Sequence, residues 1–156
     1  MGSVLISGPA GAGKSQEAKR RRDAASRPTV VADFQSLVVA MLQQERGPDG
    51  KYPERPEWIL PLAEYTRRAV ITAARKRGID VVATNSDGDP GRRRFLLEIL
   101  GPRREDFGPA LEGTEEVIVD PGEEVIARRL AGKSGRLSRA CKQASDRWYR
   151  RLPGRR

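Results

Sequence analysis

The sequence contains no histidine, and Cys141 is its single cysteine. The lack of histidine excludes histidine general bases, Ser-His-Asp triads and the usual zinc sites. One cysteine cannot form an internal disulfide, so we expect a reducing, cytoplasmic compartment. The sequence also lacks any apolar run of about eighteen residues, so we expect no transmembrane helix. An acid–base catalyst in this chain would therefore have to be a group other than histidine.

The length of 156 residues is enough for one domain with a hydrophobic core and too short for two. Residues 1–7 have neither the basic stretch nor the long apolar segment of a signal peptide, so we do not expect one. We predict a single domain over residues 1–152, followed by a short basic tail at 153–156.

The net charge of +9 is concentrated at one end of the chain. Residues 128–156 contain eleven Lys or Arg and one acid, Asp146, so they carry +10, whereas residues 1–127 carry −1. A basic surface favours partners that bear phosphates. We therefore expect any contact with nucleic acid to involve the C-terminal fifth of the chain rather than the whole domain.

Short β-branched segments alternate with helical patterns along the chain. The patterns predict strands at 4–7, 29–32, 79–84 and 116–119. They predict helices at about 14–25, 34–42, 58–77, 91–100, 121–131 and 138–153. This order predicts an α/β fold: a three-layer sandwich around a short parallel sheet with right-handed crossovers.

The segment after the first predicted strand matches the phosphate-binding pattern G-x-x-x-x-G-K-[ST] at every specified position. Its glycines let backbone N–H groups turn toward phosphate oxygens, and the helix that follows adds its positive N-terminal end. A chance glycine-rich turn is the alternative, but the predicted strand and helix on either side favour nucleotide binding. We predict that ATP binds with Mg²⁺, through Gly8, Ala10, Gly11, Ala12, Gly13, Lys14 and Ser15. In this prediction Lys14 reaches the β- and γ-phosphates and the Ser15 hydroxyl binds the metal.

A phosphate-binding loop near residue 1 of so short a chain resembles the P-loop kinases of the nucleotide and polynucleotide type. The clearest further segment, residues 81–93, is similar to the third-strand segment of phage polynucleotide kinases. Aligned on Pro90, the family's acidic residue falls on Asn85 and its asparagine on Asp87. The resemblance thus implies a P-loop kinase fold and leaves Asp87 as the candidate metal-binding carboxylate. An ordinary turn with helix capping is the alternative for this segment.

Asp33 follows the second predicted strand, where the resemblance places a general base for the acceptor hydroxyl. A carboxylate suits this task in a chain without histidine. Gln35 stands where the family has an arginine. The alternative is that Asp33 only caps the helix that follows.

Residues 117–130 resemble the kinase element that leads into a lid, which we place at about 128–140. The resemblance makes several arginines candidates to neutralise charge on the transferred phosphoryl group: Arg128, Arg129, Arg136 and Arg139. Arginines near a helix C-terminus also stabilise the helix dipole without catalysis, so that role stays open.

The proline-rich loop at 46–57 lies where P-loop kinases place their acceptor site. Tyr52 could stack on a base or sugar while Arg55 meets phosphate, although a plain solvated loop is the alternative. Arg67, on the next helix, could face the acceptor. We expect that helix to bury a stripe made of Leu62, Tyr65, Ala69 and either Thr72 or Ala73.

Trp148 and Tyr149 lie among arginines in the last predicted helix and could grip a single strand. The alternative, which the position near the chain end favours, is that Trp148 attaches its helix to the core.

These observations predict an ATP- and Mg²⁺-dependent phosphotransferase that acts on a nucleoside, a nucleotide or a 5′-hydroxyl polynucleotide end. A small P-loop ATPase that acts as a DNA- or protein-regulated switch is the alternative function. A nucleotide-binding module without catalysis is the third.

Overall fold

Four strands form one parallel sheet at the centre of the structure, a computed structural model that describes residues 2–48, 53–101, 114–131 and 136–151. The sheet order is β2–β3–β1–β4. The strands are β1 (Val4–Ser7), β2 (Thr29–Ala32), β3 (Asp80–Asn85) and β4 (Glu115–Ile118). In the register, Ile6 of β1 lies opposite Thr84 of β3 and Val117 of β4. All four carboxyl ends therefore meet at one edge of the sheet.

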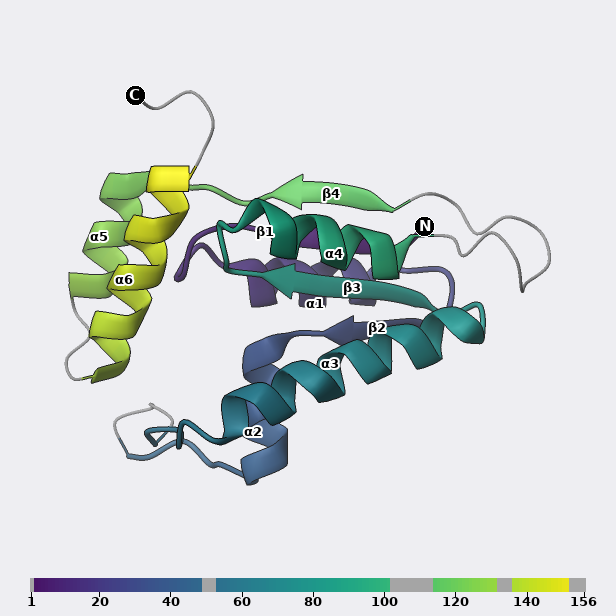
Figure 1. Cartoon of the computed structure of the whole chain (residues 1–156), viewed down its shortest axis with the longest axis horizontal. Helices are drawn as coiled ribbons and strands as arrows, with labels where there is room; N and C mark the ends of the chain where they lie inside the picture. Colours follow the sequence, from purple (N-terminus) through teal and green to yellow (C-terminus); the bar gives the residue numbers. More distant parts are fainter. Residues whose placement is uncertain (1, 49–52, 102–113, 132–135, 152–156) are drawn as a thin grey trace.

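Helices cover both faces of this sheet and its carboxyl edge (Figure 1). They are α1 (Lys14–Asp23), α2 (Phe34–Leu42), α3 (Ile59–Lys76), α4 (Pro90–Leu100), α5 (Glu123–Ala131) and α6 (Arg136–Arg151). α3 and α4 pack on one face, and α1 packs on the other. Figure 1 shows α5 and α6 side by side beyond the arrowheads of the strands. This arrangement is the predicted three-layer α/β sandwich.

The alternation of side chains along the strands divides the core into two parts. Leu5, Val81 and Ala83 pack against Ile71 of α3 and against Leu96 and Leu100 of α4. Val4, Ile6 and Val82 pack toward Ala18 of α1 on the other face. Because both faces are covered, the central strands are apolar without a polar side, as is typical of parallel sheets.

The predicted order of strands and helices is confirmed, with shifts at a few boundaries. α5 begins at Glu123 rather than at Pro121, because Gly122 has a φ of 94° and cannot belong to a right-handed helix. α6 begins at Arg136, earlier than the expected start near Ser138. Within the described ranges, no helix is both long and apolar enough to cross a membrane.

The predicted buried stripe of α3 is wrong. Leu62 and Tyr65 are exposed at 47% and 72%. The buried side of α3 instead runs through Ile59, Ala63, Arg67, Ile71 and Ala74. The helix has apolar residues on two opposite faces, and Arg67 interrupts the buried one. Treating arginine as a surface residue therefore assigns the wrong face to the core.

Candidate functional site

The phosphate-binding loop connects β1 to α1 at the carboxyl edge of the sheet, and its backbone is shaped by glycines. Gly11 and Gly13 have φ angles of 82° and 95°, which side-chain-bearing residues rarely adopt. A Cβ atom at Gly8 would overlap the Val119 carbonyl oxygen. The backbone nitrogen of Gly8 also donates to the Asn85 carbonyl, at 3.1 Å. The loop is thus fitted closely against the ends of β3 and β4.

Lys14 is buried at the start of α1, and its Nζ donates to the Pro9 carbonyl at 2.6 Å. Burial lowers the pKa of this amine to about 8, and Asp33 partly opposes the shift by attracting the ammonium. The amine therefore lies across the loop and donates to the Pro9 carbonyl. A phosphate oxygen could compete with that carbonyl for the amine.

Asp33 joins the phosphate-binding loop to β3 and α2. Its Oδ2 accepts hydrogen bonds from Ser15 Oγ at 3.1 Å and from Thr84 Oγ1 at 2.7 Å. Its Oδ1 accepts from the backbone nitrogen of Ser36 at 2.8 Å and from Ser36 Oγ at 2.7 Å. Burial favours a raised pKa, but these bonds outweigh it and hold the pKa of Asp33 below its ordinary value.

Asp33 thus caps α2 and contacts Ser15 at the same time. The cap engages Oδ1, whereas Oδ2 faces the phosphate-binding loop. The capping role and a role in the site are therefore compatible, because different oxygens of one carboxylate serve them.

The loop after β3 is a turn that ends in a helix cap. The Asn85 side chain bonds both backbone groups of Asp87, and the Asp87 carboxylate accepts from the backbone nitrogen of Asp89 at 3.0 Å. Asp89 in turn caps α4 by accepting from the backbone nitrogen of Arg92 at 2.9 Å. The turn-and-cap alternative for this segment is therefore present in the structure.

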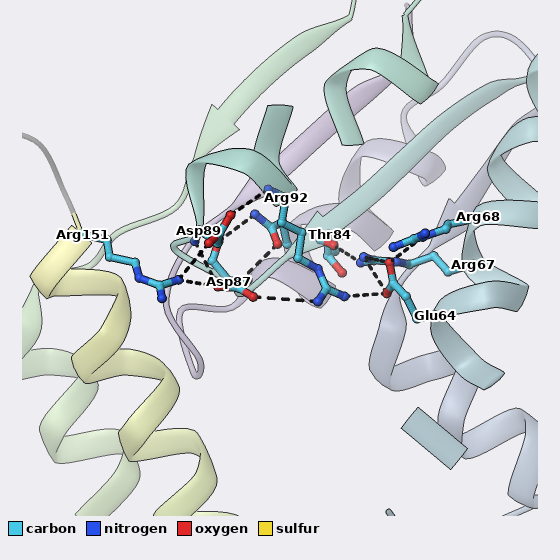
Figure 2. A network of polar contacts seen from close by, with 9 residues as sticks. Glu64, Arg67, Arg68, Thr84, Asp87, Asp89, Arg92 and Arg151 are labelled. Atoms are coloured by element: carbon cyan, nitrogen blue, oxygen red, sulfur yellow. Dashed lines mark hydrogen bonds and ion pairs between the residues drawn. The ribbon is translucent and has the colours of Figure 1, made fainter. Parts of the chain in front are cut away.

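The predicted metal ligand Asp87 lies between two arginines (Figure 2). Its carboxylate is 3.3 Å from Arg151 of α6 and 3.8 Å from Arg92 of α4. The carboxylate in contact with Ser15 is Asp33. Among the described residues, no group of three or more Cys, Asp or Glu is arranged to hold a metal ion by itself.

Glu64 of α3 gathers three arginines beside the end of β3 (Figure 2). Its carboxylate lies 2.9 Å from Arg67, 3.3 Å from Arg68 and 2.8 Å from Arg92. Arg67 also donates to the Thr84 carbonyl at 2.7 Å. Burial lowers the pKa of Arg67, and Glu64 opposes that shift. The Arg67 guanidinium is thus engaged with protein groups, which suits the positioning of Thr84 rather than a direct contact with substrate.

Arg55 lies beside the start of α2. It donates to Gln35 Oε1 at 2.7 Å, and its guanidinium lies 5.8 Å from the centre of the Phe34 ring. The Arg55 guanidinium is thus held beside Gln35 at the start of α2. Tyr52, the other loop residue predicted for the acceptor, lies outside the described residues.

The α5–α6 pair lies against the phosphate-binding loop. Arg129 donates to the Gly11 carbonyl at 3.0 Å, and Arg128 is exposed on the same helix. An apolar cluster joins the loop to both helices: Ala12 comes from the loop, Ile126 and Leu130 from α5, and Trp148 and Tyr149 from α6. The side chain of Arg136, the third predicted lid arginine, lies outside the described residues, as does that of Arg139.

Trp148 and Tyr149 are 3% and 6% exposed, so they attach α6 to the core and do not offer a stacking surface for bases. Tyr149 also donates to Asp120 at 2.7 Å. The alternative in which Trp148 fixes its helix is therefore confirmed.

Sequence reasoning missed three residues that organise this site: Thr84, Ser36 and Glu64. Thr84 had a usable signal, since it is a hydroxyl at the carboxyl end of a buried strand. The sequence carried no usable signal for Glu64, because its partners come from α3 itself and from α4, which only the fold brings together.

Comparison with known proteins shows which solved structures have a similar fold. No family model and no curated protein matches this sequence. The structure is similar to a chain of the Pnkp1/Rnl/Hen1 RNA repair complex, with a TM-score of 0.66 and 13% identity. That match covers 96% of this chain but 45% of the other, so this chain spans less than half the length of that protein.

Two further matches are a gluconokinase and a sugar kinase. A gluconokinase from Sinorhizobium meliloti matches with a TM-score of 0.52 and 18% identity, over 94% of this chain and 74% of that one. A Janibacter sugar kinase matches with a TM-score of 0.50 and 17% identity, over 93% and 78%. The chain has a P-loop kinase-like fold. At these identities the likeness describes the architecture and not the reaction.

Proposed function

We propose that this chain is an ATP- and Mg²⁺-dependent phosphotransferase that acts on a hydroxyl of a nucleoside, a nucleotide or a 5′-hydroxyl polynucleotide end. The observation that carries the proposal is the 3.1 Å contact between Ser15 Oγ and Asp33 Oδ2. It brings the end of a complete phosphate-binding loop against a buried carboxylate that directly follows β2. Kinases of this fold need those two parts together, one for the donor and one for the acceptor.

The donor side consists of the loop and Lys14. The backbone N–H groups of residues 8–15 would surround the phosphates, and the Lys14 ammonium would move from the Pro9 carbonyl to the β- and γ-phosphates. The Ser15 hydroxyl and the Asp33 carboxylate are oxygen donors of the kind that Mg²⁺ prefers. They therefore fit the metal, with Ser15 binding it directly, and Asp87 remains the second candidate carboxylate. Bound there, Mg²⁺ would neutralise charge that develops on the phosphate oxygens.

The acceptor side centres on Asp33. Asp33 would take the proton of the acceptor hydroxyl as that oxygen bonds to the γ-phosphorus, while the bond from this phosphorus to the β–γ bridging oxygen breaks. Thr84 donates to the carboxylate, and Arg67 in turn donates to the Thr84 carbonyl. Arg55 and Tyr52 are the proposed acceptor contacts, and Arg128, Arg129 and Arg136 are the proposed lid residues that stabilise the transferred charge.

The test is phosphoryl transfer from ATP labelled at the γ-position to a panel of nucleosides, nucleotides and 5′-hydroxyl oligonucleotides. We expect label on one acceptor class, and we expect Asp33→Asn to lower that rate by about 10²–10⁴-fold, the usual range for removal of a general base. Asparagine is also a good N-cap, so this variant should still fold.

Asp89→Asn is the matched control, because it makes the same change at the cap of another helix, α4. It should transfer label at close to the wild-type rate. Release of free phosphate without any labelled acceptor would overturn the kinase proposal. An Asp33→Asn rate equal to that of Asp89→Asn would overturn the role of Asp33 as base.

A nucleotide-dependent switch is the second candidate, and the bonding of Asp33 favours it. Each Asp33 oxygen already accepts two hydrogen bonds, which leaves little capacity for an acceptor proton. For a switch we expect ATP hydrolysis that a nucleic acid or a protein stimulates, with no labelled acceptor in the same panel.

A further inference from the structure

One face of α3 exposes a continuous row of uncharged side chains, which we name the α3 stripe: Trp58, Leu62, Tyr65, Ala69 and Ala73. Its three large members are 64%, 47% and 72% exposed. Their spacing of four and three residues places them on one side of the helix, with Trp58 at its N-cap. The core-facing side of α3 is opposite and packs against α2, α4, β2 and β3.

Such a row is unusual on the surface of a folded protein. Of the four large hydrophobic residues exposed in the described part of the chain, three lie on this stripe. Aromatic residues are enriched at protein–protein interfaces, whereas charged residues are depleted at their centres. The stripe fits this description, because no charged side chain belongs to it. Nucleic-acid surfaces, in contrast, need cations among the aromatics.

The stripe is graded in size along the helix. Trp58, Leu62 and Tyr65 occupy its N-terminal half, and Ala69 and Ala73 occupy its C-terminal half. If a second α3 lies antiparallel to the first, the large half of each helix meets the small half of the other. Tyr65 then lies against Ala69 of the second copy, and Leu62 lies against Ala73.

The charges at the two ends of α3 also favour the antiparallel orientation. Glu54 and Glu57, with Arg55 between them, come just before the large half and give that end one net negative charge, and Lys76 and Arg77 come just after the small half. Antiparallel pairing brings the acidic end of one helix to the basic end of the other. Parallel pairing would bring like charges and the large side chains together instead.

We propose that the α3 stripe is an isologous interface through which two copies of this chain associate, with their α3 helices antiparallel. A two-fold axis near the middle of α3 satisfies the size and charge matching in both copies at once. Eighteen residues of helix extend about 27 Å, so the contact is smaller than a standard interface. The dimer is therefore weak and concentration-dependent.

The proposed interface leaves the phosphate-binding loop accessible. Glu64 and Arg67, which face the end of β3, lie on other sides of α3 than the stripe. The test of the dimer does not measure phosphotransfer, so either proposal can fail without the other.

Sedimentation of the full chain from about 1 to 500 μM, across the range in which weak interfaces associate, provides the test. The average mass should rise from 17.3 kDa toward twice that value. Tyr65→Glu and Ala69→Trp should each remain at the monomer mass, the first through an unpaired charge and the second through overlap with Tyr65. Ala40→Trp, at an exposed alanine of α2, is the matched control and should dimerise like the wild type. Circular dichroism and thermal unfolding confirm that each variant is folded.

Orientation is tested with single cysteines in a Cys141→Ser background. A mixture of Leu62→Cys and Ala73→Cys chains should form the mixed disulfide in preference to either homodimer. A wild type that stays monomeric throughout, or a Tyr65→Glu variant that dimerises normally, would overturn the proposal. Two other results would also overturn it. One is cross-linking in which Leu62→Cys homodimers dominate. The other is a monomeric chain that binds an oligonucleotide and loses that affinity in Tyr65→Glu.

Discussion

Among single residues, Lys14 should report nucleotide binding most directly, through a change in its pKa. Its pKa of about 8 arises because burial penalises the ammonium, while its hydrogen-bond partner, the Pro9 carbonyl, is uncharged. Phosphate oxygens carry formal charge and would stabilise the ammonium far better. Nucleotide binding should therefore raise the pKa of Lys14 toward and beyond its ordinary value of 10.5.

This difference predicts proton uptake when ATP binds near pH 8. About half of the free chains carry a neutral Lys14 at that pH, so binding should take up about half a proton, and the affinity should fall as the pH rises further. Calorimetry in two buffers with different ionisation enthalpies measures the uptake. Lys14→Met should abolish it, and uptake that persists in this variant would mean that another group titrates.

Among the elements, the α5–α6 pair depends on one apolar cluster for its place on the phosphate-binding loop. Trp148 belongs to that cluster, and its Cα lies 3.0 Å from the position that a Cβ would take at Gly88. α6 therefore touches the loop after β3 as closely as two backbones allow. The ion pairs from Arg151 to Asp87 and Asp89 add little, because these groups are well exposed.

The two tryptophans of the chain provide a matched pair for testing this cluster. Trp148→Ala should lower the free energy of unfolding by about 3–5 kcal/mol, because it removes a large buried side chain. Trp58→Ala should change it by less than about 0.5 kcal/mol at low protein concentration, because Trp58 is exposed. Denaturant unfolding followed by circular dichroism measures both, and equal effects would contradict the packing of α6 described above.

Sequence patterns predict these elements well where the signal is local. The phosphate-binding loop, the alternation of strands with helices and the cap at Asp33 each depend on residues within a few positions of one another. The partners of Asp33 were not predictable in this way, because Ser15 and Thr84 lie 18 and 51 residues away. The buried side of α3 was missed for a related reason: the buried Arg67 finds partners in the Thr84 carbonyl of β3 and in Glu64, and the first of these comes from a distant segment.

Across the whole molecule, one series of polar contacts connects α6 to the phosphate-binding loop, and Figure 2 shows the part of it from Arg151 to Thr84. It runs from Arg151 through Asp87 to Arg92, and then through Glu64 to Arg67. Arg67 bonds Thr84, which bonds Asp33, which bonds Ser15. The nucleotide site and the C-terminal helix thus lie at the two ends of one connected set of side chains.

The same helix carries much of the positive charge of the molecule. Lys142, Arg147 and Arg150 are exposed on α6, while its aromatic residues are buried. Any contact with nucleic acid on this surface would therefore be with phosphates and would lack base stacking. Such a contact is insensitive to base sequence and strongly dependent on salt.

Replacing Arg147 and Arg150 by Gln should therefore weaken binding to single-stranded oligonucleotides and reduce its salt dependence. Each phosphate contact that is lost lowers the slope of log affinity against log salt by about 0.7, so the double variant should lose about 1.4. Lys19→Gln with Arg22→Gln removes the same charge from α1 and is the control. Fluorescence anisotropy over a salt series measures the slopes. If both double variants lose slope equally, the attraction depends on net charge alone, and α6 provides no nucleic-acid site.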